Sequence, residues 1–84
     1  MNALIALMCE VNDEKKMELV LHALLTDKEL EAIENRIQII KKLNQNKTQR
    51  QISSELGVGI ATVTRGALAF KEGKFEVLRP YLCK

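Results

Sequence analysis

Apolar residues dominate the first 25 positions of the chain. Residues 3–11 are almost entirely apolar, and a second apolar run from Met17 to Leu25 follows a polar interval. Asn12 or Asp13 in that interval can accept a hydrogen bond from a free backbone amide and so begin the second helix. Helices that are apolar on nearly all sides need cover from other elements, and a chain of 84 residues offers little. We therefore expect residues 1–25 to be apolar dimerisation helices.

A longer core helix is predicted over residues 26–44. TDKE at positions 26–29 has the form of a capping box, in which the threonine hydroxyl and the glutamate carboxylate satisfy free backbone amides. Apolar side chains then recur at the three- and four-residue spacing of a buried stripe. The stripe comprises Leu30, Ile33, Ile37 and Ile40, Asn44 continues the spacing, and Lys41 and Lys42 lie off it. NQNK at positions 44–47 breaks the pattern.

Two short helices joined by glycines are predicted within residues 48–71. TQRQ at positions 48–51 repeats the capping-box form, Ile52 and Leu56 are expected to point inward, and Gly57 can supply the left-handed residue that ends the helix. Gly59 can cap the second helix, which runs from about position 60 to Lys71 and stops at residues 72–73. This order is typical of a helix-turn-helix, whose second helix enters the major groove of DNA.

The last helical piece is expected within residues 74–84, where FEVLRPYL is bent or ended near Pro80. No strand alternation or internal repeat interrupts the helical pattern. The fold class is therefore predicted as all-α, with residues 1–84 forming a single domain of about six short helices per subunit.

The stretch GVGIATVTRG at positions 57–66 has an unusual composition for a helix. The short side chains of Ile60, Ala61, Thr62 and Thr64 would let the helix seat deeply in a groove, with methyl groups available to thymine. An ordinary pair of packed helices joined by a glycine turn is the alternative. Gly66 lies inside the helix, where its missing side chain leaves room for either a neighbouring helix or a flat ligand.

Charge is distributed unevenly although the net charge is only +2. Residues 1–35 carry eight acidic and three basic side chains, giving −5, whereas residues 36–84 carry ten basic and three acidic side chains, giving +7. A basic half favours a polyanion such as nucleic acid as partner, and a merely solvated surface is the alternative.

Several classes of protein fit the sequence poorly. Cys9 and Cys83 are isolated, which favours reduced thiols over a disulfide framework or a metal site. The apolar run at residues 3–9 is too short to span a bilayer and lacks the basic start of a signal peptide, so a cytoplasmic protein without membrane contact is expected. His22 lies in an apolar helix without a nucleophile motif or paired acids, so no enzymatic activity is expected.

Three segments resemble the tryptophan repressor family. GVGIATVTRG is very similar to that family's signature, while LLTDKELEAIENRIQIIKKL and TQRQISSELG resemble its third and fourth helices in order. The resemblance covers about residues 25–71. It implies an intertwined homodimer with a helix-turn-helix head that represses transcription at palindromic double-stranded operator DNA when L-tryptophan binds as corepressor, with no cofactor besides that ligand.

The resemblance places two arginines around the ligand. Arg36 and Arg65 would lie on opposite faces of the indole ring, where a guanidinium is attracted to the ring face. Arg65 would also meet the ligand carboxylate, and Thr26 would supply a hydroxyl at a helix N-terminus. Without the resemblance, Arg36 would be read as an ordinary surface arginine.

The resemblance also supplies the rest of the pocket. Gly66 would make room for the ring, and Thr62 and Ile39 would form the floor. Backbone carbonyls near Ala23 of the partner subunit and Leu25 of the partner subunit would accept hydrogen bonds from the ligand ammonium group.

On the DNA side, the matching positions combine small and basic side chains. They are Gln49, Arg50, Ile60, Ala61, Thr64 and Lys71. Arg50 is the candidate for a direct guanine contact because its guanidinium can donate two hydrogen bonds to O6 and N7. Lys71 would serve a phosphate.

The chain departs from the family pattern after TRG. Ala69 removes a hydroxyl that can bind the ligand ammonium group, Leu68 replaces a polar side chain near the DNA end, and Ser53 stands where a lysine would contact phosphate. Ala69 and Leu68 favour a second hypothesis, a constitutive helix-turn-helix DNA-binding protein that has lost tryptophan sensing, whereas Ser53 predicts weaker non-specific affinity for DNA. A helical dimerisation or adaptor module without DNA function is a third.

Overall fold

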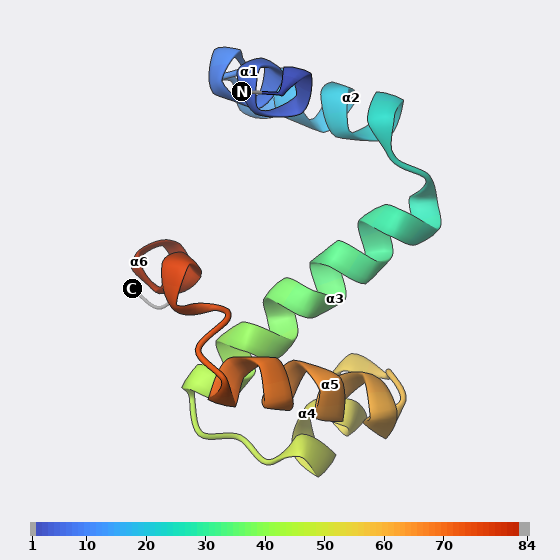
Figure 1. Ribbon diagram of the computed structural model, residues 1–84. Helices are drawn as coiled ribbons and strands as arrows, with labels where there is room; N and C mark the ends of the chain where they lie inside the picture. The colour runs from blue at the N-terminus through green and yellow to red at the C-terminus, as the bar shows by residue number, and fades with distance from the viewer. Residues whose placement is uncertain (1, 83–84) are drawn as a thin grey trace. The chain divides into compact units, whose positions relative to one another are not determined.

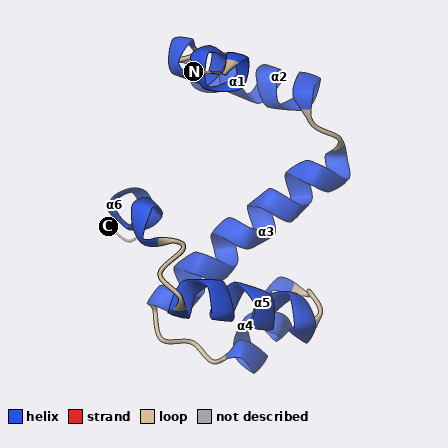
Figure 2. Ribbon diagram, viewed as in Figure 1, coloured by secondary structure: helices blue, strands red, loops and turns tan. Residues whose placement is uncertain are grey.

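The computed structural model describes residues 2–82, and all regular structure in that range is helical (Figures 1 and 2). The elements are α1 (Ala3–Glu10), α2 (Glu14–Leu24), α3 (Asp27–Asn44), α4 (Gln49–Leu56), α5 (Ile60–Lys71), the 3-10 helix η1 (Glu76–Leu78) and α6 (Arg79–Leu82). The all-α prediction is confirmed. The chain divides into two compact units, an N-terminal unit (Met1–Glu31) and a C-terminal unit (Ala32–Lys84).

Side-chain caps define the helix starts of the N-terminal unit. At the start of α1, the Asn2 side chain accepts a hydrogen bond from the amide of Ile5 (3.0 Å). Asn12 and Asp13 are the two candidate caps for α2, and Asp13 is the one that accepts a hydrogen bond, from the amide of Lys16 (2.8 Å). The predicted capping box of α3 is present. Its Glu29 amide donates to Thr26 Oγ1 (3.1 Å) and its Thr26 amide donates to Glu29 Oε1 (2.8 Å).

The N-terminal unit leaves most of its apolar surface exposed. Neither α1 nor α2 contains a buried residue. Leu19 is 71% exposed, and Leu4, Ile5 and Leu24 are each about half exposed or more. Exposed apolar surface on this scale marks an interaction site in most proteins.

The C-terminal unit contains the buried core. Ile39 and Ile40 are each 2% exposed, and Ile52 and Val63 are fully buried. The partly buried side chains around this core are Leu43, Leu56 and Val58. The prediction that the first short helix points Ile52 and Leu56 inward is confirmed.

The predicted buried stripe on α3 is partly wrong. Ile33 is 42% exposed, whereas Ile39, which lies off the stripe, is among the most buried residues. The reason is that α3 is covered on two sides: Ile39 packs in the core with Ile52 and Val63, while Ile40 packs with the segment that follows α5. Cover on two sides buries adjacent positions, which a single stripe does not anticipate.

The NQNK segment ends α3 through a left-handed residue. Asn46 has a φ of 63°, its amide donates to the Leu43 carbonyl (3.0 Å), and the Lys47 amide donates to the Lys42 carbonyl (3.2 Å). This hydrogen-bond pair is a Schellman motif, which satisfies carbonyls that the helix leaves free. Apart from glycine, asparagine is among the residues that most readily adopt this backbone conformation.

The final helical piece does not end at Pro80 within the described residues, but it changes next to Pro80 from the 3-10 turn η1 to the α-helix α6. Pro80 is the second residue of α6, after the 3-10 turn η1. Proline is tolerated there because amides of a first helical turn have no partner in the helix. Positions 83–84 of the predicted C-terminal helix lie outside the described residues.

An ionic cluster joins the end of α3, the link and α4. Glu55 accepts hydrogen bonds from Lys42 Nζ (2.6 Å) and from Lys47 Nζ (2.8 Å). Both hydrogen bonds lower the pKa of the Glu55 carboxyl below its ordinary value, and the one from Lys42 has the larger effect. The cluster therefore fixes α4 against the end of α3 without using apolar surface.

The lowered pKa predicts a pH-dependent contribution of Glu55 to stability. The ionised carboxylate is favoured in the folded protein, so its contribution is complete above the ordinary value of 4.5 and disappears as the pH falls through the lowered pKa. Urea unfolding of the wild type and of Glu55→Gln should differ at neutral pH and converge in acid. A difference between the two proteins that is independent of pH would contradict the ion cluster.

Candidate functional site

Helices α4 and α5 form a helix-turn-helix with a short, well-defined turn. Thr48 and Gln51 make the predicted capping box at the start of α4. Gly57 follows α4 with a φ of 67°, a left-handed conformation that few residues other than glycine and asparagine adopt. The Ser53 hydroxyl donates to the Val58 carbonyl (2.6 Å) and so holds the turn closed. Ser53 therefore has a structural role in this chain, which its sequence position did not reveal.

The predicted DNA-facing residues all lie on α4 and α5, and the exposed surface that carries them is termed the outer face. Gln49, Arg50, Ile60, Ala61, Thr64 and Lys71 are all exposed. Thr64 Oγ1 lies 2.7 Å from Gln49 Oε1 and 2.9 Å from the Ile60 carbonyl oxygen, two acceptors that share its single proton. The Gln49 contact joins the start of α4 to the face of α5, so the two helices present one continuous surface.

The basic side chains of the C-terminal unit fall into two groups. Lys42, Lys47, Lys74 and Arg79 each pair with a glutamate. Within residues 2–82, a second group forms no ion pair or side-chain hydrogen bond. Its members are Arg36, Lys41, Arg50, Arg65 and Lys71.

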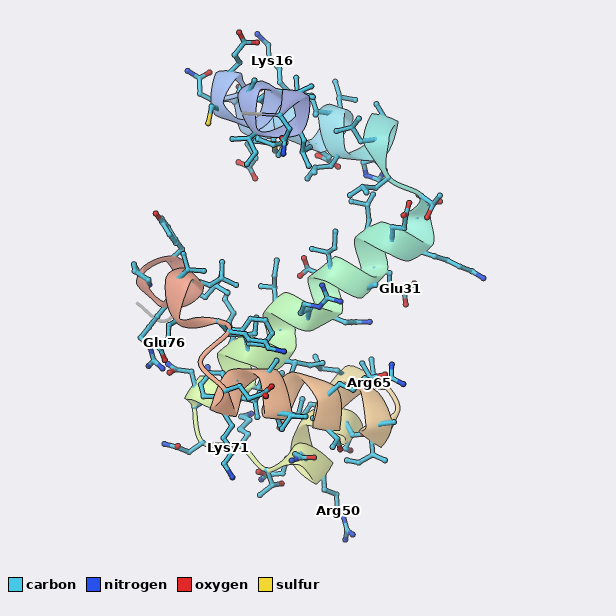
Figure 3. The ribbon with its side chains drawn as sticks, viewed as in Figure 1. Lys16, Glu31, Arg50, Arg65, Lys71 and Glu76 are labelled. Atoms are coloured by element: carbon cyan, nitrogen blue, oxygen red, sulfur yellow. The ribbon has the colours of Figure 1, made fainter. Side chains whose placement is uncertain are left out.

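The second group is where the positive charge of this unit remains uncompensated. Arg50 and Lys71 project from the same side of the helix-turn-helix, and Arg65 projects from another (Figure 3). The phosphate backbone of DNA is attracted to such a surface whatever the base sequence, because each contact between a cation and a phosphate releases counterions.

The predicted ligand residues are divided between the two units. Ala23, Leu25 and Thr26 belong to the N-terminal unit, and Arg36, Ile39, Thr62, Arg65 and Gly66 belong to the C-terminal unit. Thr26 already accepts the capping hydrogen bond of α3. Arg36, Thr62 and Arg65 are exposed, whereas Ile39 is buried.

Gly66 has a packing role within the C-terminal unit. A Cβ atom at position 66 would lie 2.8 Å from Ile39 Cγ2, a distance that real Cβ atoms essentially never show. The Ile39 methyl is attached directly to its own Cβ, so it cannot swing away as the end of a long side chain could. Close packing of α3 and α5 therefore requires glycine here, and this explains Gly66 independently of any ligand.

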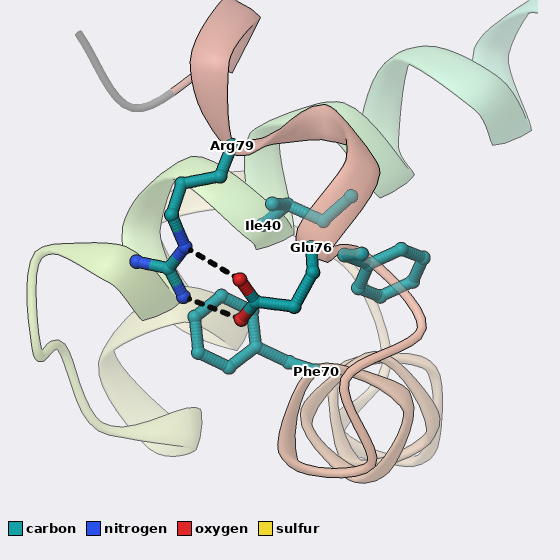
Figure 4. Close-up of a pocket in the computed structure, with 5 residues that line it drawn as sticks. Ile40, Phe70, Glu76 and Arg79 are labelled. Carbon is teal, nitrogen blue, oxygen red and sulfur yellow. Dashed lines mark hydrogen bonds and ion pairs between the residues drawn. The ribbon is translucent and has the colours of Figure 1, made fainter.

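A small pocket lies between α3, α5 and the C-terminal segment (Figure 4). It is lined by Ile40, Phe70, Phe75, Glu76 and Arg79. Arg79 donates to both Glu76 oxygens (2.9 and 3.1 Å) and to Asn44 (3.2 Å), and its guanidinium lies 5.9 Å from the centroid of the Phe70 ring. None of the predicted ligand residues lines it. The spacing of three between Glu76 and Arg79 is a sequence signal for their ion pair, while the hydrogen bond from Arg79 to Asn44 attaches the C-terminal segment to the end of α3.

Metal and membrane sites find no support in the described part of the chain. No group of three or more His, Cys, Asp or Glu side chains in it could hold a metal ion. None of its helices has both the length and the apolar character needed to cross a membrane. Cys9 is exposed and forms no disulfide, and Cys83 lies outside the described residues.

Comparison with known proteins gives one consistent result. Residues 1–77 match the family model described as Trp repressor protein. A Trp operon repressor homolog of Xylella fastidiosa (strain 9a5c) is 36% identical over 74 residues, which cover 87% of this chain and 80% of the relative.

Two further Trp operon repressor homologs are more similar over shorter segments. That of Vibrio vulnificus (strain YJ016) is 43% identical over 60 residues, covering 70% of this chain and 59% of the relative. That of Photobacterium profundum is 46% identical over 59 residues, covering 69% of this chain and 57% of the relative. No solved structure matches this chain significantly.

The contact between Gly66 and Ile39 predicts a strong coupling between the two positions. Gly66→Ala should gain about 1 kcal/mol of helix propensity but lose about 1–3 kcal/mol through overpacking. In an Ile39→Ala background the obstructing methyl is absent, so the same substitution should become stabilising. Urea unfolding of the four proteins measures this coupling, and strictly additive effects would contradict the contact.

Proposed function

This chain belongs to the Trp repressor family, and we propose that it is a transcriptional repressor that binds operator DNA when a small aromatic ligand, L-tryptophan, is bound. The family match and the repressor homologs support the function as a transcriptional repressor. The ligand is supported by the family resemblance and by the exposed side chains of Arg36 and Arg65.

The observation that carries the DNA-binding part is the outer face of the helix-turn-helix. It combines exposed small side chains on α5 with unpaired Arg50 and Lys71 on the same side. Small side chains let a helix approach base edges, and the flanking cations bind phosphates. Arg50 would read a guanine, and Lys71 would hold a phosphate.

The ligand part is supported by two unpaired arginines. Arg36 on α3 and Arg65 on α5 are exposed and have no acidic partner among the described residues. Two guanidinium groups with no partner suit a ligand that has both an aromatic ring and a carboxylate. Thr62 and Ile39 would border the ring, while Thr26, and Ala23 and Leu25 of the partner subunit, would bind the amino acid backbone.

A homodimer is the natural cover for the apolar surface of α1 and α2. Neither helix buries a residue within its own unit. Association with a second copy would remove this surface from water at about 25 cal/mol per Å². An intertwined dimer would also place two reading heads on a palindromic operator.

The second candidate is a constitutive DNA-binding protein. The specific observation in its favour is that Ile39 accounts for Gly66 without a ligand. Ala69 and Leu68 add to it, because they depart from the family pattern beside the ligand and DNA positions.

Operator affinity with and without tryptophan decides between the two candidates. We expect saturating tryptophan to raise wild-type affinity by about 5- to 150-fold, the usual range of allosteric coupling. Arg65→Ala should reduce that response, because the variant lacks one face of the ring clamp and the carboxylate partner. Lys41→Ala, which removes an unpaired cation outside the predicted site, is the matched control. Wild-type affinity that is insensitive to tryptophan would leave the constitutive candidate.

The two cations on the outer face should have different roles. Arg50→Ala should cost about 1–3 kcal/mol on operator DNA and relax the base preference at one position of each half-site. Lys71→Ala should weaken all sequences alike and reduce the salt slope by about 1. Fluorescence anisotropy on operator and random duplexes over a salt series measures both. Equal losses on the two duplexes for Arg50→Ala would contradict base reading.

The apolar face of α1 and α2 predicts an obligate dimer whose unfolding depends on protein concentration. Sedimentation should show a dimer at every micromolar protein concentration tested. Leu19→Glu should weaken association by placing a charge on the most exposed large apolar side chain of the N-terminal unit. A folded wild-type monomer under these conditions would rule the dimer out.

A further inference from the structure

Two large apolar side chains of α5 are exposed, Ile60 at the start of the helix and Leu68 near its end, and Leu68 is the more exposed of the two. It is 59% exposed, whereas Val63 of the same helix is fully buried. The partly buried positions of α5, which are Gly66, Ala67, Ala69 and Phe70, leave Leu68 on the outer side. A single exposed leucine is common in proteins, so its position on the helix is what gives it meaning.

Helical geometry places Leu68 on the outer face, towards the end of α5. It follows Ala61 by seven residues, which is close to two turns, and it follows Thr64 by four. Lys71 comes three residues later and shares the same side. The outer stripe of α5 therefore runs from Ala61 through Thr64 and Leu68 to Lys71, with the leucine between the small residues and the cation.

Leu68 has no polar group, so it cannot bind a phosphate or a base edge by hydrogen bonding. The apolar group that base pairs present in the major groove is the C5-methyl of thymine. We propose that Leu68 is a specificity-determining residue that packs against a thymine methyl in each operator half-site. This proposal rests on the DNA-binding function proposed above and adds a base preference to it.

Thymine and deoxyuridine differ only by this methyl group, so they test the contact directly. The operator is first selected from a random duplex pool with the wild-type protein in saturating L-tryptophan, and each thymine is then replaced in turn by deoxyuridine under the same conditions. At one position per half-site the replacement should weaken wild-type binding by about three- to tenfold, the value of a buried methyl or two. Leu68→Ala should lose a similar factor on the thymine duplex and nothing further on the deoxyuridine duplex.

Val77→Ala is the matched control. Val77 is an exposed aliphatic residue of the same unit that lies outside α5. Its substitution should leave every thymine-to-deoxyuridine effect as in the wild type. Circular dichroism checks that Leu68→Ala keeps its helices, as expected for an exposed position.

Two outcomes would overturn the proposal. One is that Leu68→Ala binds all duplexes as tightly as the wild type. The other is that the loss of affinity from Leu68→Ala is the same on every duplex, whichever thymine has been replaced by deoxyuridine. Failure of the wild-type protein to select or bind DNA would instead overturn the proposed DNA-binding function, so the two failures can be told apart.

Discussion

The close approach of α3 and α5 at Gly66 is the constraint on which the C-terminal unit depends. The methyl group of Ile39 occupies the space that a side chain at position 66 would need, and Ile39 packs in the same core as Ile52 and Val63. This contact sets the position of α5 on α3. Since α4 packs against the same residues, the orientation of the whole helix-turn-helix follows from one missing Cβ atom.

Polar contacts also fix parts of the C-terminal unit that the small apolar core does not reach. Glu55 ties α4 to the end of α3 through two lysines, Ser53 closes the turn, and Gln49 joins Thr64. Most of these groups are partly exposed, so each contributes modestly to stability. Their main effect is on orientation, because they act at the ends of helices whose centres are held by apolar packing.

The division of charge follows from the same arrangement. Glutamates neutralise the lysines and the arginine that hold the C-terminal unit together, whereas Arg50 and Lys71 remain unpaired on the outer face. Structural cations and binding cations are thus separate groups. The N-terminal unit has the opposite character, since it exposes large apolar side chains and its charged residues are mainly acidic, a combination that does not suit a polyanion.

The sequence alone determined the helices, their caps and the helix-turn-helix, because these depend on residues three or four positions apart. Thr26 with Glu29, Thr48 with Gln51, and Gly57 all act as the local pattern predicts. Only the tertiary structure decided which face of α3 is buried, why Gly66 must be glycine, and which cations are paired. Those properties depend on contacts such as Ile39 with Gly66 and Asn44 with Arg79, which join residues far apart in the chain. A periodic pattern gives the spacing of a buried face, but the direction of that face is set by whichever helices pack against it.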